Sequence, residues 1–410
     1  MVCRVAIVGA GWAGLACAVE LADAGCSVDV FEASRTLGGR ARAIALEGLT
    51  VDNGAHLLIG AYTETLRLIA KVGAGKTAFL RTPLHLEYPG RCRLAAPAWP
   101  APWHLVWALL TAQGLRWREK LAALRFMRAL NRCHFRLPRD YPARRLFATQ
   151  PEALRRFLWE PLCLAALNTP PAEASAQVFL NVLKASLAGK SADSDLLFPA
   201  CDLSRLFPEP AAAFVAARGG RVLRGRRIRS LAELSHYDQR VIAVAPQHLA
   251  TLAPELAASF SFTWQPIATC YLQYPAGTRL SFPMLGLSGY PGQWLFDRGA
   301  LCGQDGLFAA VISGAGAWQS LSHAALAKAI HDEVASLLPK LPPPRWSRVI
   351  VEKRATFACT PNLARPATAT AVPGLWLAGD YVAGEYPATL EGAVRSGIAA
   401  ARSILQATGL

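Results

Sequence analysis

The arrangement of apolar residues near the amino end of the chain predicts a strand, a helix and a second strand. The segment RVAIVGAGWAGLACAVELADAGCSVDVFEA contains the apolar run Val5–Val8, a glycine-rich turn, a helical stretch over Ala16–Leu21 and a second apolar run that ends at Glu32. Short, continuous apolar runs on either side of a helix are typical of parallel strands that are buried on both faces. The chain is therefore expected to begin with an α/β domain.

Apolar runs predict further strands in two distant parts of the chain. The sequence after residue 217 favours strands at Arg221–Leu223, Arg227–Leu231 and Val241–Ala245. Near the carboxyl end, in GLWLAGDYVAGEYPATLEGAVRSG, a short apolar run ends at Gly379 and Asp380, and a loop leads to a helix that begins near Thr389. An aspartate at the carboxyl end of a buried strand requires a polar partner.

The first turn has the pattern of a dinucleotide-binding site. It carries GxGxxG at Gly9, Gly11 and Gly14, between the predicted strand and the predicted helix. Glycines at these positions let the backbone amides at the helix start, Trp12 and Ala13, approach a pyrophosphate. Glu32 follows about twenty residues later, where an acid accepts hydrogen bonds from ribose hydroxyls and disfavours the 2′-phosphate of NADP. The pattern predicts a Rossmann-like domain and is compatible with both NAD and FAD.

The motif LGGRAR, which follows the second strand, adds a glycine pair and an arginine. Gly38 and Gly39 allow a sharp turn, and the planar guanidinium of Arg40 suits a pyrophosphate. Arg42 either makes a similar contact or faces solvent. A glycine pair and an arginine at this position resemble one class of flavoproteins, which comprises the amine oxidases, the carotenoid desaturases and their relatives. This resemblance favours FAD over NAD.

The resemblance to these flavoproteins implies further contacts with FAD. In this class a carboxyl-terminal Gly-Asp pair, matched here by Gly379 and Asp380, holds the ribityl-phosphate part of the cofactor. The start of the last helix, at Thr389 and Leu390, would face the flavin pyrimidine, where the helix dipole favours negative charge. The backbone around Ile228 would contact the adenine.

The same resemblance covers the whole chain and implies an α/β fold with a discontinuous FAD-binding domain. We expect this Rossmann-like domain over residues 1–75, 200–255 and 346–410. The intervening segments, 76–199 and 256–345, would form an α+β substrate domain with a helical part and an antiparallel sheet. A chain of 410 residues, of which 53% are hydrophobic, is long enough for two or three domains.

Several long stretches resemble a narrower group, the squalene-associated FAD-dependent enzymes known as hydroxysqualene dehydroxylases. These stretches are FLWEPLCLAALNTPPAEASA, SDLLFPACDLSRLFPEPAAAFVAARGG, EKRATFACTPNLARP, DNGAHLLIGAY and YPATLEGAVRSG. The resemblance implies a reaction of bacterial squalene and hopanoid synthesis in which the hydroxyl group of hydroxysqualene, a C30 isoprenoid, is removed reductively to give squalene. An electron donor, which no motif identifies, must then reduce the FAD.

Three other functions remain open at this point. Desaturation of a carotenoid-like polyene would need a similar apolar tunnel, although the loop GEYPAT lacks the His-Pro-Gly-Gly stretch of carotenoid desaturases. Flavin amine oxidases place an aromatic residue immediately before the motif LEG, where this chain has Thr389. A non-catalytic protein that binds prenyl groups is disfavoured by Arg40, Asp380 and the intact glycine turn.

Candidate catalytic residues come from the segments that are expected at the flavin. Related enzymes pass a D-x-G stretch close to the flavin ring, which implicates Asn53, Gly54, Ala55 and His56. Hydroxide is a poor leaving group, so we expect an acid to assist, and His56, Tyr386 and Glu385 are the candidates. A lone histidine is commonly structural, and Tyr386 could equally be a packing residue. The cation left behind would be stabilised by aromatic faces in a dry pocket and quenched by hydride from reduced FAD.

Charge and cysteine spacing limit the partners. The net charge of +15 comes from basic residues spread along the chain, and no nucleic-acid motif accompanies them, so we expect no nucleic-acid partner. The ten cysteines show no CxxC spacing, which favours reduced thiols in the cytoplasm and gives no support for a metal site. None of them lies beside the final loop in the sequence, and Cys359 is the nearest, so we expect FAD to be bound non-covalently.

One segment, from Pro97 to Leu130, combines aromatic and basic residues. It contains Trp99, Trp103, Trp107 and Trp117, together with Arg116, Arg118, Lys120, Arg125 and Arg128. Such a segment suits the headgroup layer of a bilayer, but the tryptophans could equally form the core of a helical domain. Prolines, glycines and hydroxyl residues interrupt the long uncharged runs, so we expect no membrane-spanning helix. The expected location is the cytoplasm, peripheral on the inner membrane surface.

Overall fold

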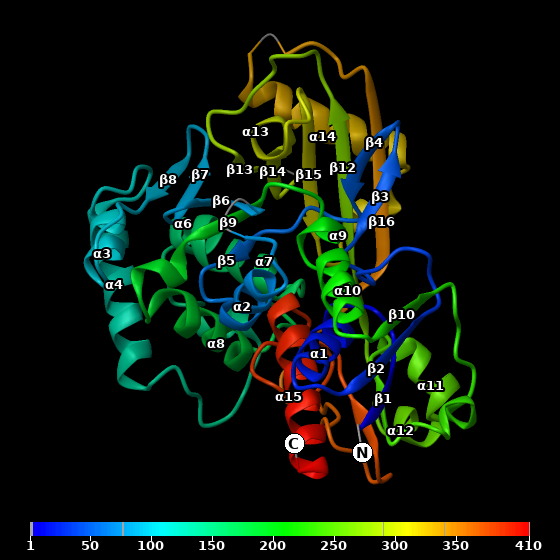
Figure 1. Cartoon of the computed structure of the whole chain (residues 1–410). Coiled ribbons are helices and arrows are strands. Elements are labelled where there is room, and N and C mark those ends of the chain that lie inside the picture. The colour runs from blue at the N-terminus through cyan, green and yellow to red at the C-terminus, as the bar shows by residue number, and fades with distance from the viewer. Residues whose placement is uncertain (1–2, 76–77, 290, 340, 410) are drawn as a thin grey trace.

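A parallel sheet forms the first layer of the computed structural model, which describes residues 3–75, 78–289, 291–339 and 341–409. Its strand order is β10-β2-β1-β11-β17 (Figure 1). The strands are β1 (Arg4–Val8), β2 (Ser27–Glu32), β10 (Arg221–Arg224), β11 (Gln239–Ile242) and β17 (Leu375–Leu377). In the centre, Ile7 of β1 is in register with Val30 of β2 and Val241 of β11, and all three are fully buried. The strands need continuous apolar sequences because both faces of the sheet are covered.

Three helices pack together beside this sheet. They are α1 (Trp12–Asp23), α10 (Pro208–Ala217) and the carboxyl-terminal helix α15 (Leu390–Thr408). Figure 1 shows α15 running beside α1 in the lower centre of the molecule. The two helices approach closely because residue 397 is a glycine: a Cβ atom on Gly397 would collide with the carbonyl group of Ala13.

An antiparallel sheet forms a second layer, in the order β13-β14-β15-β12-β16. Its strands are β12 (Trp264–Gln273), β13 (Met284–Gly286), β14 (Trp294–Asp297), β15 (Leu307–Ser313) and β16 (Trp346–Phe357). Side chains alternate between the two faces of β12, as the strand geometry requires. Ala268, Cys270 and Leu272 belong to the core that contains helix α14 (His323–Leu337), whereas Tyr271 packs in a separate core with β7 and β9.

The remaining elements form three small antiparallel sheets and further helices, and the helices between residues 103 and 187 form a helical region on the left of Figure 1. The small sheets contain β3 (Ala43–Leu46), β4 (Leu49–Asp52), β5 (Leu58–Ile59), β6 (Phe79–Thr82), β7 (His85–Tyr88), β8 (Cys92–Ala95) and β9 (Leu196–Pro199). The helices are α2 (Thr63–Lys71), α3 (Trp103–Leu110), α4 (Trp117–Arg132), α5 (Ala143–Leu146), α6 (Glu152–Leu154), α7 (Glu160–Leu167), α8 (Ala176–Leu187), α9 (Leu203–Leu206), α11 (Leu249–Leu252), α12 (Pro254–Ala258) and α13 (Arg298–Cys302), with a π-helical turn at Arg155–Trp159.

Most of the elements predicted at the two ends of the chain are confirmed. The first strand and the second strand lie where the apolar runs indicate, and α1 begins at Trp12 rather than near Ala16. The last helix begins at Leu390, and Thr389 is its N-cap, because the Thr389 Oγ1 atom accepts a hydrogen bond from the amide of Gly392 at 2.9 Å. The strand predicted at Val241–Ala245 is observed slightly earlier, as β11.

The strand predicted at Arg227–Leu231 is wrong. Glu233 Oε1 accepts hydrogen bonds from the amides of Arg229 at 2.8 Å and Ser230 at 3.1 Å, so these two amides are not available to a neighbouring strand. The chain instead enters a 3₁₀ helix at Leu231. Ile228 is buried between exposed arginines, and this single buried position does not make the alternating pattern of a strand.

The parallel sheet and the antiparallel sheet draw their strands from different segments of the chain, except that both use segment 346–410. All strands of the parallel sheet fall inside segments 1–75, 200–255 and 346–410. Strand β16, however, begins at Trp346 and pairs with β12, so the antiparallel sheet extends into the segment that the sequence assigns to the FAD-binding domain.

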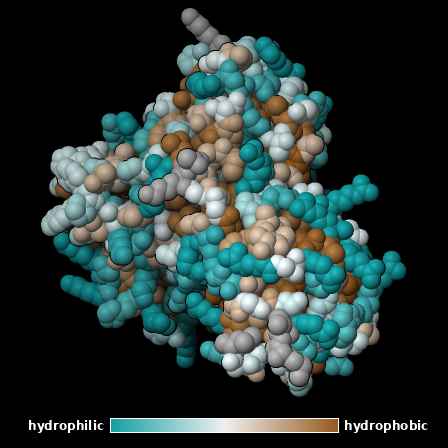
Figure 2. Space-filling model, in the orientation of Figure 1, coloured by the Kyte–Doolittle hydropathy of each residue, from teal (hydrophilic) through white to brown (hydrophobic). Residues whose placement is uncertain are grey.

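Among the described residues, no helix is both long and apolar enough to cross a bilayer. Figure 2 shows polar residues over much of the visible face.

Candidate functional site

One continuous cavity of about 820 Å³ extends from the parallel sheet into the helical region. Its lining includes nearly all residues that the sequence assigns to the cofactor: Gly9, Gly11, Trp12, Ala13, Glu32, Arg40, Asn53, Gly54, Ala55, His56, Ile228, Gly379, Asp380, Thr389 and Leu390. The fold thus brings together three distant parts of the sequence. Gly14 is the one predicted cofactor residue that is not part of the lining.

The glycine turn between β1 and α1 has the backbone geometry that a phosphate-binding turn needs. Gly9 has a φ angle of +111°, and a Cβ atom there would lie 2.6 Å from the carbonyl oxygen of Ala243. A Cβ atom on Gly14 would collide with the carbonyl oxygen of Gly9, so Gly14 permits close helix–strand packing. A Cβ atom on Gly11, which lines the cavity, would meet no other atom within 4 Å. The backbone at Gly11 is therefore accessible to a ligand, as a dinucleotide requires.

Glu32, at the end of β2, is held in place by the backbone. Its Oε2 atom accepts a hydrogen bond from the amide of Ala10 at 2.8 Å, and its Oε1 atom accepts one from the amide of Ser34 at 2.8 Å. The carboxylate lines the cavity next to the glycine turn. A fixed acceptor at this position suits the hydroxyl groups of a ribose.

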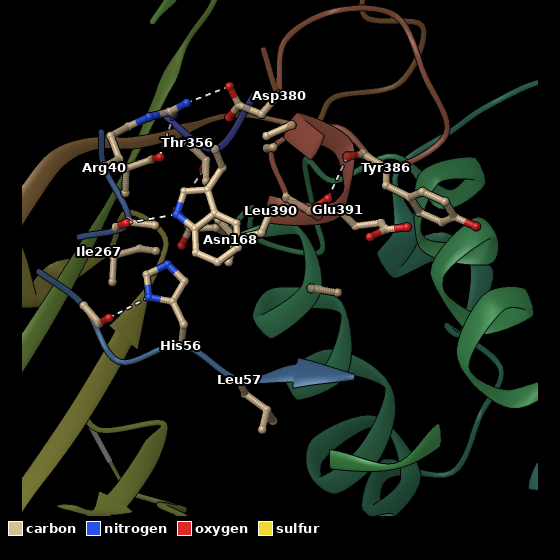
Figure 3. Close-up of a pocket in the computed structure, with 18 of the residues that line it drawn as sticks. Arg40, His56, Leu57, Asn168, Ile267, Thr356, Asp380, Tyr386, Leu390 and Glu391 are labelled. Atoms are coloured by element: carbon tan, nitrogen blue, oxygen red, sulfur yellow. Dashed lines mark hydrogen bonds and ion pairs between the residues drawn. The ribbon is translucent and has the colours of Figure 1, made fainter. Parts of the chain in front are cut away.

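Arg40 and Asp380 meet at the cavity although they are 340 positions apart in the sequence. The Arg40 Nη2 atom lies 2.6 Å from Asp380 Oδ1, and Nη1 donates to the carbonyl of Ala355 at 2.8 Å (Figure 3). The Arg40 side chain keeps 27% of its area exposed and the Asp380 side chain 9%, so the cation has the greater access to a ligand. Arg42 instead turns back and donates to the carbonyl of Gly39.

The final loop and the start of α15 form another wall of the cavity. Thr389 Oγ1 donates to the carbonyl of Tyr386 at 2.8 Å while it caps the helix. A Cβ atom on Gly392 would collide with the same Tyr386 carbonyl, so the tight turn requires glycine there. The buried carboxylate of Glu391 accepts a hydrogen bond from the Thr65 hydroxyl at 2.7 Å and pairs with Arg395 at 2.7 Å. These contacts fix the helix start against α2.

His56 is the titratable group of the segment from Asn53 to His56, which enters the cavity after β4. Its Nδ1 atom lies 2.6 Å from the carbonyl oxygen of Gly54, so Nδ1 carries a proton that it donates. Burial lowers the pKa of His56, although the Gly54 carbonyl and the nearby Asp52 carboxylate favour the imidazolium form. In that form the second ring nitrogen, Nε2, is also a donor.

The other two candidate acids are placed less favourably. Tyr386 lines the cavity, but its ring lies 4.8 Å from the guanidinium of Arg395, and Figure 3 shows it directed away from His56 and Arg40. Burial raises the pKa of Tyr386. The side chain of Glu385 is exposed and does not line the cavity. Of the three candidates, His56 is therefore the one that lines the cavity without being directed away from Arg40.

A buried ion pair anchors the segment that carries His56. Asp52, at the end of β4, is 2% exposed, and its Oδ2 atom lies 3.1 Å from Nη1 of Arg298 at the start of α13. Asp52 Oδ1 accepts a hydrogen bond from the amide of Leu203 at 2.7 Å, and its carbonyl accepts one from the Tyr271 hydroxyl at 2.7 Å. The loop beyond Asp52 is thereby tied to both the antiparallel sheet and the start of α9.

The other end of the cavity is apolar, and sequence patterns do not identify its residues. Its walls are aliphatic and aromatic side chains from α3, α4, the π-helical turn, α7 and α8: Leu105, Leu109, Ala123, Met127, Leu158, Trp159, Leu162, Phe179 and Leu183. Asn168 and Thr356 lie nearer the polar end and bond to each other at 2.9 Å. No motif marks these residues, because ordinary core helices have the same composition.

Cys359 lies closer to the final loop than its sequence position indicates. Its Sγ atom is 3.9 Å from the carbonyl oxygen of Pro387. The residue is buried, it does not line the cavity, and burial raises the pKa of its thiol to about 12. A protonated thiol is a poor nucleophile. In the described part of the chain, no group of three or more His, Cys, Asp or Glu residues could hold a metal ion.

Comparison with known proteins agrees with this geometry. The family model described as flavin containing amine oxidoreductase matches residues 12–405. The proteins named hydroxysqualene dehydroxylase from Rhodopseudomonas palustris and Sinorhizobium fredii are 31% and 30% identical to this chain. The alignments cover 98% of this chain and 98% of the first relative, and 99% of this chain and 99% of the second.

More distant similarities extend over similar lengths. A protein of Synechococcus elongatus named probable zeta-carotene desaturase is 24% identical, over 99% of each chain. Among solved structures, the cyclohexylamine oxidase of Brevibacterium oxydans superposes with a TM-score of 0.69 at 17% identity, over 100% of each chain. This structural likeness confirms the predicted fold.

Proposed function

The chain belongs to the flavin-containing amine oxidoreductase family, and on this basis we propose that it removes the hydroxyl group of hydroxysqualene to give squalene. The observation that carries the proposal is the continuity of the cavity, which leads from the dinucleotide-binding residues into a long apolar space. A C30 isoprenoid alcohol needs an apolar space for its chain and a polar end for its hydroxyl group. Two relatives of nearly the same length are named for this activity, which belongs to bacterial squalene and hopanoid synthesis.

The cofactor of this proposal is FAD, bound without a covalent bond. Glu32 would accept from the ribose, Arg40 would bind the pyrophosphate, and Asp380 would accept from the ribityl hydroxyls. Thr389 and Leu390 would face the flavin pyrimidine, and the backbone at Ile228 would face the adenine. FAD held by these residues would, when reduced, supply the hydride that replaces the hydroxyl group. The protonated Cys359 thiol lies outside the cavity lining, which supports non-covalent binding.

His56 is proposed to assist the departure of the hydroxyl group. Replacement of the hydroxyl group by hydrogen requires one proton, which leaves with the oxygen as water, and one hydride, which is added to the carbon. The hydrogen bond from Nδ1 to Gly54 orients the imidazole, and the imidazolium form offers a proton on Nε2. Because burial lowers its pKa, this imidazolium is a stronger acid than a solvated histidine. The apolar walls exclude water from the reacting carbon, so that water does not intercept a cation.

The remaining partners follow from the chemistry of the substrate. A C30 hydrocarbon alcohol dissolves in lipid, so the protein is proposed to work as a peripheral protein on the cytoplasmic surface of the inner membrane. Each turnover consumes one hydride, so an electron donor must reduce the FAD again.

The test of this function is a product analysis under anaerobic conditions. The reduced holoenzyme, incubated with hydroxysqualene, is expected to form squalene and to oxidise one flavin for each squalene formed. Deuterium carried by the reduced flavin is expected at the carbon that lost its hydroxyl group. The control is the oxidised holoenzyme with hydroxysqualene, which should form no squalene.

Desaturation of a carotenoid-like polyene is the second candidate, because the cyanobacterial relative is similar over nearly its whole length. Oxidised holoenzyme incubated with phytoene distinguishes the two functions. A conjugated polyene from this mixture, with no squalene from the first, would assign the protein to the desaturases. Purification of a colourless protein would instead favour a prenyl-binding protein without redox chemistry.

A further inference from the structure

Four tryptophans lie exposed in the segment that contains α3 and the start of α4. Relative to their full areas, Trp99 is 45% exposed, Trp103 64%, Trp107 45% and Trp117 66%. Trp99 and Trp107 pack against each other with ring centroids 5.0 Å apart, and Leu110 and Leu121 are exposed close by in the sequence. These tryptophans are therefore not the core of a helical domain. Exposed aromatic side chains, two of them in contact, indicate an interaction surface in this segment.

Basic residues accompany these tryptophans in the sequence almost without acidic ones. The segment from 97 to 139 contains eight basic residues, Arg116, Arg118, Lys120, Arg125, Arg128, Arg132, Arg136 and Arg139, and Glu119 is its one acid. Glu119 accepts a hydrogen bond from the amide of Arg116 within the first turn of α4. Within the described ranges, none of these arginines forms an ion pair with a carboxylate. The surface therefore carries cationic charge that its own protein does not neutralise.

The same two helices form a wall of the substrate cavity. Leu105 and Leu109 of α3 and Ala123 and Met127 of α4 line the cavity, while Trp103, Trp107 and Trp117 lie on the outside. An α-helix with its side chains is about 10–12 Å across, so only one layer of helix separates the apolar cavity from the exposed tryptophans. Figure 1 places α3 and α4 at the left edge of the molecule, and Figure 2 shows teal residues along the lower edge of this part, with paler residues above them.

We propose that the outer face of α3 and α4 docks on an anionic lipid bilayer and that the isoprenoid substrate enters the cavity from the lipid between these helices. Tryptophans prefer the headgroup layer, where the ring contacts acyl chains and the N–H group contacts water. Basic residues beside them are attracted to anionic headgroups. The proposal that this face binds lipid rests only on its exposed tryptophans and its positive charge. The identity of the molecule that enters the cavity rests on the proposed function.

The binding experiment uses the full-length holoenzyme and sedimentation with vesicles of phosphatidylglycerol or of phosphatidylcholine. Each basic residue near an anionic surface strengthens binding roughly five-fold. The double variant Arg125→Ser/Arg128→Ser is therefore expected to bind phosphatidylglycerol vesicles roughly 25-fold more weakly. The matched control, Arg345→Ser/Arg402→Ser, removes two exposed arginines elsewhere and should bind nearly as the wild type does. Trp103→Ser/Trp107→Ser should weaken binding to both kinds of vesicle with FAD content unchanged.

Two outcomes would overturn the docking surface. Equal vesicle binding by the arginine variant and its control would show that this face does not contact lipid. Loss of a dimer in the tryptophan variant, with vesicle binding unchanged, would assign the face to a second copy of the chain. Entry from lipid is tested separately by measuring squalene formation in two media. The variants should slow squalene formation when the substrate is carried in vesicles, but not when it is carried in detergent micelles. Equal slowing in micelles would overturn the entry route, whereas a wild type without squalene in either medium would reject the proposed function.

Discussion

Replacing Arg298 with methionine should destabilise the protein in a way that depends on pH. In the wild type, the Asp52 carboxylate has the Arg298 guanidinium at 3.1 Å, and the two side chains are 3% and 6% exposed. Removing one partner of such a pair leaves an uncompensated buried charge, at a cost of about 3–5 kcal/mol. Methionine retains much of the volume of the arginine stem, so the change tests mainly the charge.

The expected shift in melting temperature follows from the length of the chain. Unfolding entropy near 60 °C is about 2.1 cal/mol/K per residue, which for 410 residues gives about 0.9 kcal/mol/K. A loss of about 3–5 kcal/mol should therefore lower the melting temperature by roughly 3–6 °C. Differential scanning calorimetry with excess FAD measures this shift and keeps the contribution of the cofactor constant.

The sign of the pH dependence follows from the pKa of Asp52. Burial raises this pKa above its usual value, and the Arg298 guanidinium and the Leu203 amide oppose the increase. Without Arg298 the pKa should rise further. A carboxyl group whose pKa is higher in the folded state stabilises the fold while it is protonated, and this stabilisation is lost as the pH rises through the folded pKa. The variant should therefore lose less stability at about pH 5.5 than at about pH 8.

A second substitution makes the reasoning refutable. The double variant Asp52→Asn/Arg298→Met removes the buried charge while the amide oxygen can still accept from Leu203, so it should recover most of the stability at about pH 8. Asp52→Asn alone is the matched control. An equal loss at both pH values, or no recovery in the double variant, would show that the buried charge of Asp52 does not cause the destabilisation.

The cofactor and acid assignments lead to three further predictions. Asp380→Ala and Arg40→Ala should each release most of the flavin, measured as absorbance per protein after gel filtration; full occupancy in both variants would refute the cofactor assignment. His56→Ala should retain FAD but lower squalene formation roughly 10²–10⁴-fold, and wild-type turnover should decline as the pH rises through the lowered pKa of His56; an unchanged rate would remove His56 from the mechanism. Acid precipitation should free all flavin from the wild type and from Cys359→Ser alike, whereas flavin retained only by the wild type would indicate a thioether.

The nucleotide end of the molecule could be predicted because its chemistry is local. The turn from Gly9 to Gly14 has its strand, its helix and its acid within about thirty residues, and each follows from the conformational freedom of glycine and the strand and helix periods. The family resemblance stated from the motifs is confirmed by relatives of nearly equal length. Asp380 and Thr389, which the resemblance assigns to the cofactor, line the cavity after strand β17 and at the start of helix α15, and their contacts with FAD stay a prediction.

Features that depend on long-range packing could not be predicted. The ion pair of Asp52 with Arg298 joins residues 246 positions apart, and neither has a motif around it. Cys359 lies next to the final loop although β17 separates the two in the sequence, so the distance along the chain did not indicate their distance in space. The error at Arg227–Leu231 has a local cause: the Glu233 side chain occupies backbone amides that a strand would have used.

The tryptophan segment shows why an apolar pattern alone does not distinguish core from surface. On α4, Trp117 and Leu121 are exposed while Ala123 and Leu130 are buried, so this helix carries large apolar side chains on its exposed side as well as on its buried side. The apolar pattern does not show which of these positions is internal, and the position of the cavity determines it. Burial in a single chain would favour large apolar residues on the inner face only. Large apolar residues on both faces are expected of a helix that has an apolar cavity on one side and a lipid headgroup layer on the other.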